Sequence, residues 1–219
     1  LLKKISLEML ISKKKIILLD LDGVLINSLK NMRTSWNNTR KKFNIKHTFN
    51  DYEKLIGLPF YSILQKFDLN SEDYSKIKKN YDSISNKKLA LIKIYPNVKD
   101  TLNYLIKKKY TIGLITSKDK KRTKKIISKF KLKFKYVYSP TNQIKPKPYP
   151  DQILKIVKLE KIKKKDCIYI GDMSLDKKFA KNAGIKFIHA VYGYEKKKIN
   201  TKFKIKKFRD LKRLLEHVF

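Results

Sequence analysis

Two pairs of aspartates, each placed directly after a short apolar run, are the residues of this sequence best suited to chemistry. Residues 15–20 (KIILLD) end in Asp20, and Asp22 and Gly23 follow; residues 166–171 (DCIYIG) are followed by Asp172 and Asp176. Paired carboxylates serve either as a metal site or as a nucleophile beside an acid/base. Four carboxylates gathered in one place repel one another unless a cation is present. Oxygen ligands without His or Cys favour Mg²⁺ as that cation.

A hydroxyl and a lysine follow two other apolar runs. Thr116 and Ser117 come after residues 110–115, where a short hydroxyl can donate a hydrogen bond to a phosphate oxygen. Lys147 lies between two prolines in residues 145–151 (KPKPYPD), and the prolines fix its backbone. Lys145, in the same segment, is the weaker candidate. Phosphoryl transfer requires a nucleophile, a group that binds the phosphoryl oxygens, a neutralising positive charge and a metal ligand. The first acids, the hydroxyl, the lysine and the last acids can supply these in turn.

Five short strands are expected to carry these residues to one place. The runs are short, rich in β-branched or aromatic residues and bounded by Asp, Ser, Gly or Pro; they are residues 15–20, 110–115, 135–138, 166–171 and 186–190. Helical patterns follow at residues 100–108, 121–130, 151–159, 175–183 and 209–218. This alternation predicts an α/β fold: a Rossmann-like parallel five-stranded sheet with helices on both faces. Ligands of such sheets lie at the carboxyl ends of the strands.

The segment between the first two predicted strands is too long for a simple crossover. It reads as helices at residues 29–43, 61–67 and 72–92, with a break at residues 57–59 (GLP) and no convincing strand. We therefore expect a helical cap domain at residues 29–93, inserted into a core domain of residues 1–28 and 94–219. Trp36 is expected to pack in the core of the cap.

The motifs DLDGVL, ITS, KPYPD and GDMSLD, in this order, resemble the four motifs of the haloacid dehalogenase-like (HAD) hydrolase superfamily. The similarity covers nearly the whole chain from Lys15 onward. Residues 57–60 (GLPF), 95–98 (YPNV) and 182–185 (NAGI) resemble the phosphoglycolate phosphatase-like branch in particular. The resemblance implies a capped HAD-like fold and a Mg²⁺-dependent phosphatase that hydrolyses a small phosphomonoester through an aspartyl-phosphate intermediate.

The resemblance also implies a role for each motif residue. Asp20 would be the nucleophile and a metal ligand, and Asp22 would be the acid/base, with its backbone carbonyl on the metal. Thr116 would bind the phosphoryl group, Lys147 would hold Asp20, and Asp172 would complete the metal site. Supporting positions are Asp176, Ser117 and Gly23.

Asp22 favours a phosphate ester as the substrate, because an alkoxide leaving group needs a proton donor. Asn27-Ser28 stand where the superfamily usually has Asp-Ser, which leaves a detail of the cap hinge open. A sugar phosphomutase of the β-phosphoglucomutase type is an alternative. It needs a cation in the cap for a second phosphate, and the loop after Gly57 (LPFY) contains no Arg or Lys.

Each residue also has a simpler interpretation. Asp172 and Asp176 could cap a helix, Thr116 could be a turn residue, and Lys147 could be one more solvated lysine. Their joint occurrence favours the site. His47, His189 and His217 are scattered, with His189 expected as a core residue. Tyr192-Gly193-Tyr194 is expected as a loop that could form part of the rim of the site.

The composition is strongly basic, with a net charge of +36 over 219 residues. Only five of the 55 basic residues are Arg, and the lysines are spread along the whole chain. We therefore interpret the charge as compositional bias that attracts small phosphorylated anions, and expect no specific nucleic-acid partner. A catalytically dead nucleic-acid-binding protein is the remaining alternative, and the four intact aspartates disfavour it.

Cysteine usage and hydropathy bear on the compartment. The single cysteine, Cys167, lies in an apolar run and is expected to be buried and structural. One cysteine allows no intramolecular disulfide, which fits a cytoplasmic protein. No apolar run has the length of a membrane span. Residues 1–14 lack the apolar core of a signal peptide, and residues 1–8 are expected to be an upstream extension.

Overall fold

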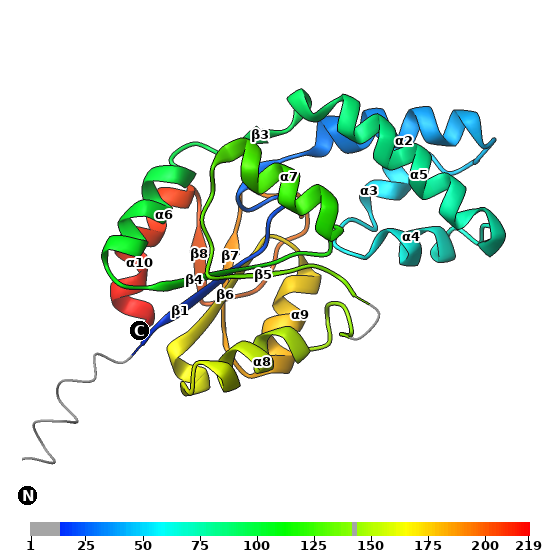
Figure 1. The fold of residues 1–219 in the computed structure, drawn as a ribbon. Helices are drawn as coiled ribbons and strands as arrows, with labels where there is room; N and C mark the ends of the chain where they lie inside the picture. The colour runs from blue at the N-terminus through cyan, green and yellow to red at the C-terminus, as the bar shows by residue number, and fades with distance from the viewer. Residues whose placement is uncertain (1–13, 142–143) are drawn as a thin grey trace, which may run out of the picture.

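A computed structural model describes residues 14–141 and 144–219, so the expectation for residues 1–8 lies outside the described residues. Its main sheet has six parallel strands in the order β5-β4-β1-β6-β7-β8 (Figure 1). They are β1 (Ile16–Leu19), β4 (Thr111–Ile115), β5 (Tyr136–Tyr138), β6 (Cys167–Gly171), β7 (Lys186–Ala190) and β8 (Phe203–Ile205). The chain first adds strands on one side of β1 and then on the other. The strand order therefore reverses beside β1, where sheets of this class bind ligands.

The predicted α/β class and all five predicted strands are confirmed, and β8 is an additional strand. This edge strand has three residues, Phe203-Lys204-Ile205, within a lysine-rich stretch. Two apolar residues in a charged stretch do not stand out as a strand in the sequence. Pairing with β7 in the folded protein supplies the hydrogen bonds that hold it.

Helices cover both faces of the sheet: α6 (Val98–Lys107), α7 (Lys120–Phe130), α8 (Asp151–Leu159), α9 (Ser174–Ala183) and α10 (Leu211–Val218). Successive strand residues point to opposite faces. Ile17 and Leu19 of β1 pack in a buried cluster with α6, α7 and α10, whereas Ile16 and Leu18 pack in a second cluster with α8 and α9. Because β1 is buried on both faces, it reads as a continuous apolar run.

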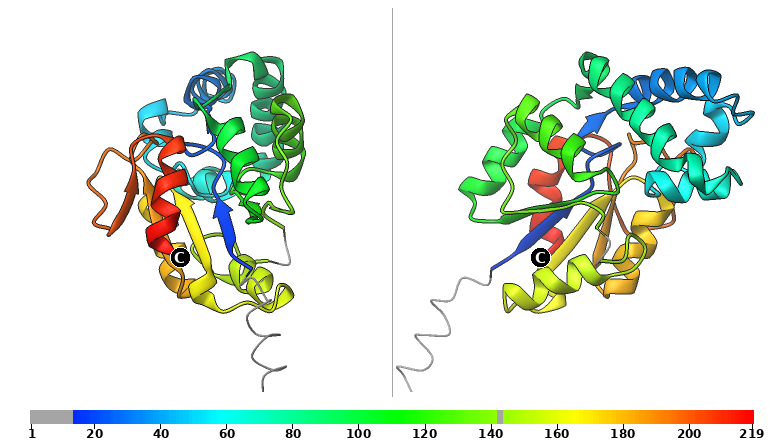
Figure 2. Two further views of the ribbon diagram at one scale, coloured as in Figure 1. Left: turned by 90° about the vertical axis from the view of Figure 1, so that its left-hand side faces the viewer. Right: turned by 45° about the vertical axis from the view of Figure 1, so that its right-hand side comes forward.

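Four helices within residues 29–87 form a group of their own, which we call the cap helices: α2 (Leu29–Lys42), α3 (Phe49–Glu53), α4 (Phe60–Lys66) and α5 (Tyr74–Lys87). They lie together beyond the carboxyl ends of the central strands (Figure 2). Trp36 is fully buried among them and contacts the rings of Tyr52 and Phe67. Helix α3 was not predicted. Helix α5 is shorter than the predicted 72–92, with short 3₁₀ turns at Ser71–Asp73 and Leu89–Leu91 on either side.

A two-stranded antiparallel ribbon joins the cap helices to the sheet. It pairs β2 (Ile26–Asn27) with β3 (Lys93–Ile94), residue Ile26 with Ile94 and Asn27 with Lys93. The sequence pattern predicts no strand at residues 93–94, because two residues are too few to show a pattern. The chain therefore leaves the sheet and returns to it through neighbouring, hydrogen-bonded strands.

Across residues 14–141 and 144–219, no helix has both the length and the apolar character needed to cross a lipid bilayer.

Candidate active site

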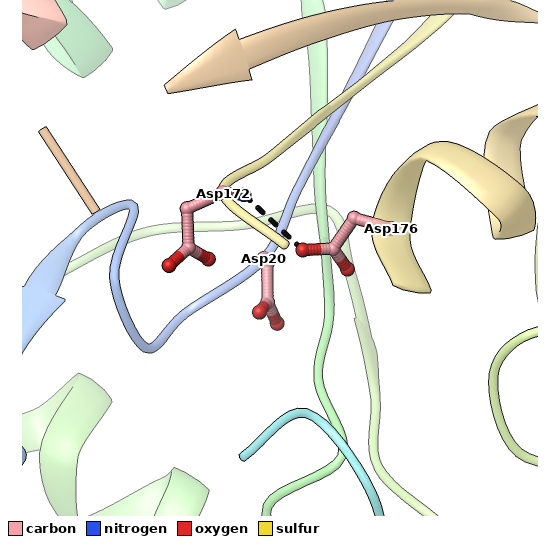
Figure 3. A group of neighbouring side chains, drawn as sticks. All are labelled: Asp20, Asp172 and Asp176. Carbon is pink, nitrogen blue, oxygen red and sulfur yellow. Dashed lines mark hydrogen bonds between the residues drawn. The ribbon is translucent and has the colours of Figure 1, made fainter. Parts of the chain in front are cut away.

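Three buried carboxyl groups meet at the carboxyl ends of β1 and β6. Leu19 pairs with Ile170, and the Asp20 amide donates to the Ile170 carbonyl at 2.9 Å, so Asp20 and Asp172 leave neighbouring strands at nearly the same level. Asp20, Asp172 and Asp176 each place a carboxylate oxygen within 4.8 Å of the other two (Figure 3). We call these three residues the acidic cluster. Such a group of buried carboxylates requires cations nearby.

Both carboxylate oxygens of Asp176 accept hydrogen bonds from other groups of the protein. One of its oxygens accepts hydrogen bonds from the amides of Asp172 and Met173, at 3.2 and 3.1 Å, at the start of α9. Its other oxygen accepts from Lys147 at 2.8 Å. Asp176 therefore does cap a helix, as the simpler interpretation expected, and it also fixes the lysine of the site. The two roles use different oxygens of one carboxylate.

Lys147 is the cation of the acidic cluster. It is buried, and its ammonium lies 3.0 Å from Asp20 and 2.8 Å from Asp176. It also lies over the ring of Tyr169, 5.1 Å from the centroid. The other candidate, Lys145, is exposed and lies over the ring of Tyr149. The structure thus places Lys147, and not Lys145, in the site.

Burial and mutual repulsion make the acidic cluster a strong proton or cation site. Burial raises the pKa of Asp20 to about 7, although Lys147 acts in the opposite direction. Burial, with Asp176 and Asp20, raises the pKa of Asp172 well above its usual value. Burial alone would lower the pKa of Lys147, but Asp176 and Asp20 raise it, so Lys147 stays charged. One lysine offsets only part of three negative charges.

The donor set fits a divalent cation. One oxygen of Asp172 accepts from the Tyr194 amide at 2.7 Å, while its other oxygen, Oδ1, is buried and has no hydrogen-bond partner among the described residues. A buried carboxylate oxygen without a partner is costly unless an ion or water binds it. Carboxylate oxygens alone are ligands that Mg²⁺ favours. Asp20 and Asp172 are therefore suited to hold Mg²⁺.

Asp22 is not part of the acidic cluster. Its Oδ1 accepts a hydrogen bond from the Ser28 hydroxyl at 2.5 Å, and its Oδ2 lies 3.0 Å from the ammonium of Lys118. Lys118 is buried, and burial lowers its pKa despite the neighbouring Asp22. The side chain of Asp22 thus has partners of its own, Ser28 and Lys118, and is not one of the three carboxylates of the acidic cluster. Lys118 was given no role in the sequence analysis, although it stands only two residues after Thr116.

The end of β4 supplies hydroxyl groups. Thr116 is buried, and its Oγ1 accepts from the Lys118 amide at 3.2 Å, which leaves its proton available to a ligand. The Ser117 hydroxyl is buried and has no hydrogen-bond partner among the described residues. Both residues line the same cavity as Asp20 and Asp22. The structure therefore brings Asp20, Asp22 and Thr116 to one cavity, and Lys147 contacts Asp20.

This cavity has a volume of about 240 Å³ and is lined from both the sheet edge and the cap helices. From the cap come apolar and aromatic side chains, with one cation, Lys78. Lys78 on α5 lies 3.7 Å from Asp119, and Arg122 on α7 donates to Ser85 of α5 at 2.8 Å. Neither Lys78 nor Arg122 was predicted, because each stands inside a lysine-rich helix where no pattern singles it out.

Two glycines allow the backbone to approach Asp172. A Cβ atom on Gly23 would lie 2.0 Å from Asp172 Oδ2, and one on Gly193 would lie 2.1 Å from Asp172 Cβ. Asp172 is fully buried, and its Oδ2 is held by the Tyr194 amide. Gly23, predicted as a supporting residue, and Gly193, in the loop after β7, thus shape the position of one carboxylate.

We expect Gly193→Ala to displace Asp172 and to weaken Mg²⁺ binding strongly. Gly113→Ala is the matched control, because its Cβ would meet the end of Leu18 at 2.7 Å and the Cβ of Tyr136 at 3.4 Å, inside the sheet and not at Asp172. Titration of Mg²⁺ against the thermal midpoint should show a lost response for Gly193→Ala. For Gly113→Ala the midpoint should fall equally with and without Mg²⁺. An unchanged Mg²⁺ response in Gly193→Ala would contradict this account.

The remaining candidates lie outside the acidic cluster. Cys167 is fully buried, and burial raises the pKa of its thiol to about 12, so it is structural as expected. His189 is buried in β7, where burial lowers its pKa. His47 stacks on Phe67, with ring centroids 4.1 Å apart, and His217 is exposed on α10.

The chain is similar in sequence to proteins named phosphoglycolate phosphatase, and it shares its fold with solved structures. The phosphoglycolate phosphatase of Aquifex aeolicus (strain VF5) is 28% identical over 188 residues, which cover 83% of this chain and 87% of that protein. That of Pasteurella multocida (strain Pm70) is 26% identical over 194 residues, covering 82% and 87%. The crystal structure of a predicted phosphoglycolate phosphatase from Haemophilus somnus 129pt superposes with a TM-score of 0.81 at 22% identity, covering 94% of this chain and 99% of that one.

The family comparison covers most of the chain. Residues 17–190 match the family described as haloacid dehalogenase-like hydrolase. This match contains all four motifs that carried the resemblance, and the predicted resemblance is therefore confirmed. The chain belongs to the haloacid dehalogenase-like hydrolase family.

Proposed function

We propose that this protein is a Mg²⁺-dependent phosphatase that hydrolyses a small phosphomonoester through an aspartyl-phosphate on Asp20. The observation that carries the proposal is the acidic cluster, paired with the buried Lys147 and open to a cavity lined by Thr116 and Asp22. Family membership and the names of the relatives support the same class of reaction.

In this proposal the side chains of the site divide the steps of the reaction among them. A carboxylate oxygen of Asp20 attacks phosphorus, and Lys147 keeps that carboxylate ionised and in place. Thr116 donates a hydrogen bond to the phosphoryl oxygens. Asp22 gives a proton to the leaving oxygen and later takes one from the attacking water. Asp20 and Asp172 would hold Mg²⁺, which would neutralise charge on the phosphoryl group.

We also propose that residues 29–93 act as a cap that selects the substrate. Residues 29–93 contribute about half of the residues lining the cavity, including Tyr52, Phe60 and Tyr81. A closed cap would exclude bulk water during phosphoryl transfer to Asp20. A cavity of about 240 Å³ suits a short phosphorylated metabolite. Several relatives are named phosphoglycolate phosphatases, and 2-phosphoglycolate is the first substrate to assay.

A panel of phosphomonoesters tests the proposal. The panel contains 2-phosphoglycolate, other short phosphorylated acids, sugar phosphates and p-nitrophenyl phosphate, each assayed for phosphate release with Mg²⁺ and with EDTA. The proposal expects release that requires Mg²⁺ and is fastest for a short substrate. Absence of Mg²⁺-dependent release over the whole panel would refute it.

A phosphomutase is the second candidate, favoured by Lys78. The loop after Gly57 lacks a cation, but α5 of the cap places Lys78 on the cavity. Lys78 already forms ion pairs with Asp82 and Asp119, so less of its positive charge is available to bind a second phosphate. Incubation with β-glucose 1-phosphate separates the two functions: a mutase forms glucose 6-phosphate, and a phosphatase releases phosphate.

The basic surface is proposed to have no specific nucleic-acid partner. A dead nucleic-acid-binding protein would bind duplex DNA with a steep salt dependence and release no phosphate. Binding to DNA measured between low and physiological salt, beside the phosphatase panel, distinguishes the two.

Stabilisation by Mg²⁺ should grow as the pH rises. Because the pKa of Asp20 rises from its usual 3.8 to about 7 in the folded protein, the folded state holds more protons than the unfolded state between these values. Without metal, this carboxyl therefore destabilises the fold as the pH rises through that window. Mg²⁺ competes with these protons. The increase in thermal midpoint caused by Mg²⁺ should be small near pH 5 and larger at pH 8. An equal increase at both pH values would contradict a metal site at Asp20.

A further inference from the structure

Tyr194 connects three parts of the molecule that the proposed reaction uses. Its amide donates to Asp172 at 2.7 Å, so its backbone holds a carboxylate of the acidic cluster. Its ring is buried in the hydrophobic cluster of the cap helices, together with Trp36 and Tyr52. Its hydroxyl lies against the β2 segment, where the chain enters the cap. From the sequence pattern, Tyr194 is predicted only as part of a loop that could form the rim of the site.

The hydroxyl of Tyr194 is bound to Ser28. It accepts a hydrogen bond from the Ser28 amide at 2.8 Å, and it lies 3.3 Å from both the Ser28 hydroxyl and the Ile26 carbonyl. Ser28 is fully buried. The Tyr194 hydroxyl therefore determines where the backbone of Ser28 lies and offers its own proton to one of two oxygens there.

Ser28 in turn holds one carboxylate oxygen of Asp22 through a hydrogen bond. The proton of its hydroxyl goes to Asp22 Oδ1 at 2.5 Å, while Asp22 Oδ2 faces Lys118 and the cavity. A carboxyl that exchanges a proton with a substrate must present one oxygen to it, and the bond to Ser28 holds the other oxygen still. Asp22 is on a tight loop closed by the bond from the Gly23 amide to the Ile26 carbonyl, at 2.9 Å. The tight loop that carries Asp22, and the carboxyl group of Asp22 itself, are thus both hydrogen-bonded to residues 26–28. Tyr194 contacts the same residues.

We propose that Tyr194 is a positioning residue, whose hydroxyl holds Ser28 and, through Ser28, the carboxyl of Asp22 in the orientation for protonating the leaving oxygen. This inference rests on the proposed phosphatase function. It goes beyond that function because it assigns a task to a loop after the fifth predicted strand, far in sequence from Asp22. The reaction step is unchanged: the proton moves from Asp22 to the leaving oxygen as the bond between phosphorus and that oxygen breaks.

Substrates with different leaving groups isolate this task. The p-nitrophenolate ion leaves readily without a proton, whereas the alkoxide of glycerol 2-phosphate must be protonated. Loss of a well-placed acid therefore affects the alkyl phosphate far more than the aryl phosphate. A general loosening of the fold would lower kcat/KM for both substrates alike. Because kcat/KM covers only the steps up to formation of the aspartyl-phosphate, it reports on the leaving-group step.

The test compares Tyr194→Phe, Ser28→Ala and the double variant with the wild-type protein, at saturating Mg²⁺. Phenylalanine keeps the ring and the amide bond to Asp172 and removes only the hydroxyl. Loss of one such hydrogen bond is expected to lower kcat/KM for glycerol 2-phosphate about tenfold and to change it little for p-nitrophenyl phosphate. The double variant should be no worse than Ser28→Ala, because both changes interrupt one chain of hydrogen bonds.

Tyr192→Phe is the matched control. It removes a tyrosine hydroxyl in the same loop that donates to the Val24 carbonyl at 2.8 Å, and it should leave the ratio between the two substrates unchanged. Equal losses on both substrates in Tyr194→Phe, or losses that multiply in the double variant, would overturn the inference. If Tyr194→Phe does not fold, Tyr194→Met is measured by the same ratio. A wild-type protein inactive on both substrates would instead refute the proposed function.

Discussion

Asp20→Asn should abolish phosphatase activity while the protein stays folded. The amide has nearly the same shape as the carboxylate but is no nucleophile toward phosphorus. Loss of a covalent nucleophile typically lowers kcat by on the order of 10⁴-fold or more. The change also removes one of three buried negative charges, so the metal-free variant has less repulsion to overcome than the wild type. The measurement is p-nitrophenyl phosphate hydrolysis with Mg²⁺.

Intermediate trapping makes this prediction sharper. Wild-type protein quenched in acid during turnover should carry the mass of one phosphoryl group on the peptide that contains Asp20, and Asp20→Asn should carry none. Asp151→Asn is the control, because Asp151 is an exposed aspartate at the start of α8, away from the cavity. Retained activity in Asp20→Asn, or a phosphoryl group on another residue, would disprove the assigned nucleophile.

Lys147→Met should lower both stability and activity, and the loss of stability should be large. The ammonium of Lys147 is buried between Asp20 and Asp176, at 3.0 and 2.8 Å. Removing one partner of a buried ion pair leaves an uncompensated charge and costs about 3–5 kcal/mol. For a chain of this size each kcal/mol lowers the thermal midpoint by roughly 2–4 °C. Thermal unfolding in EDTA at pH 8 measures this effect, because the carboxyl groups are then least protonated.

Lys145→Met provides the matched control for the lysine substitution. Lys145 stands two residues earlier in the same proline-rich segment, carries the same charge and is exposed. Its replacement should leave the thermal midpoint and the phosphatase activity within error of the wild type. Equal effects of the two substitutions would show that the lysine of the site is not Lys147.

The sequence was sufficient for the parts of the molecule that a short run of residues encodes. Residues 16–19 are apolar at every position because β1 is buried on both faces, and that run is visible without a structure. Asp20 and Asp172 were found because each directly follows such a run, and a parallel sheet brings the ends of neighbouring strands together. The proline-framed segment drew attention to Lys147 in the same way, through its local pattern.

Residues that contact the site but lie far in sequence from its motifs could not be predicted from local sequence patterns. Lys78 is one of many lysines in its helix, and only the packing of α5 against α7 shows that it meets the cavity. Tyr194 looks like a loop residue, and its contacts with Asp172 and Ser28 depend on how the segment after β7 folds back. Strand β8 and the pair of β2 with β3 are too short to produce a periodic pattern. These features depend on tertiary contacts between segments far apart in the sequence.

We propose that the ribbon formed by β2 and β3 makes the segment between them an exchangeable module. Because Asn27 pairs with Lys93, the two ends of the inserted segment lie side by side, and the order of the six-stranded sheet does not depend on what is joined between them. Insertions whose ends meet in this way are tolerated well by a host fold. A chimera that carries the corresponding segment of a relative, spliced at these two residues, should keep the chemistry and acquire the donor's choice of substrate.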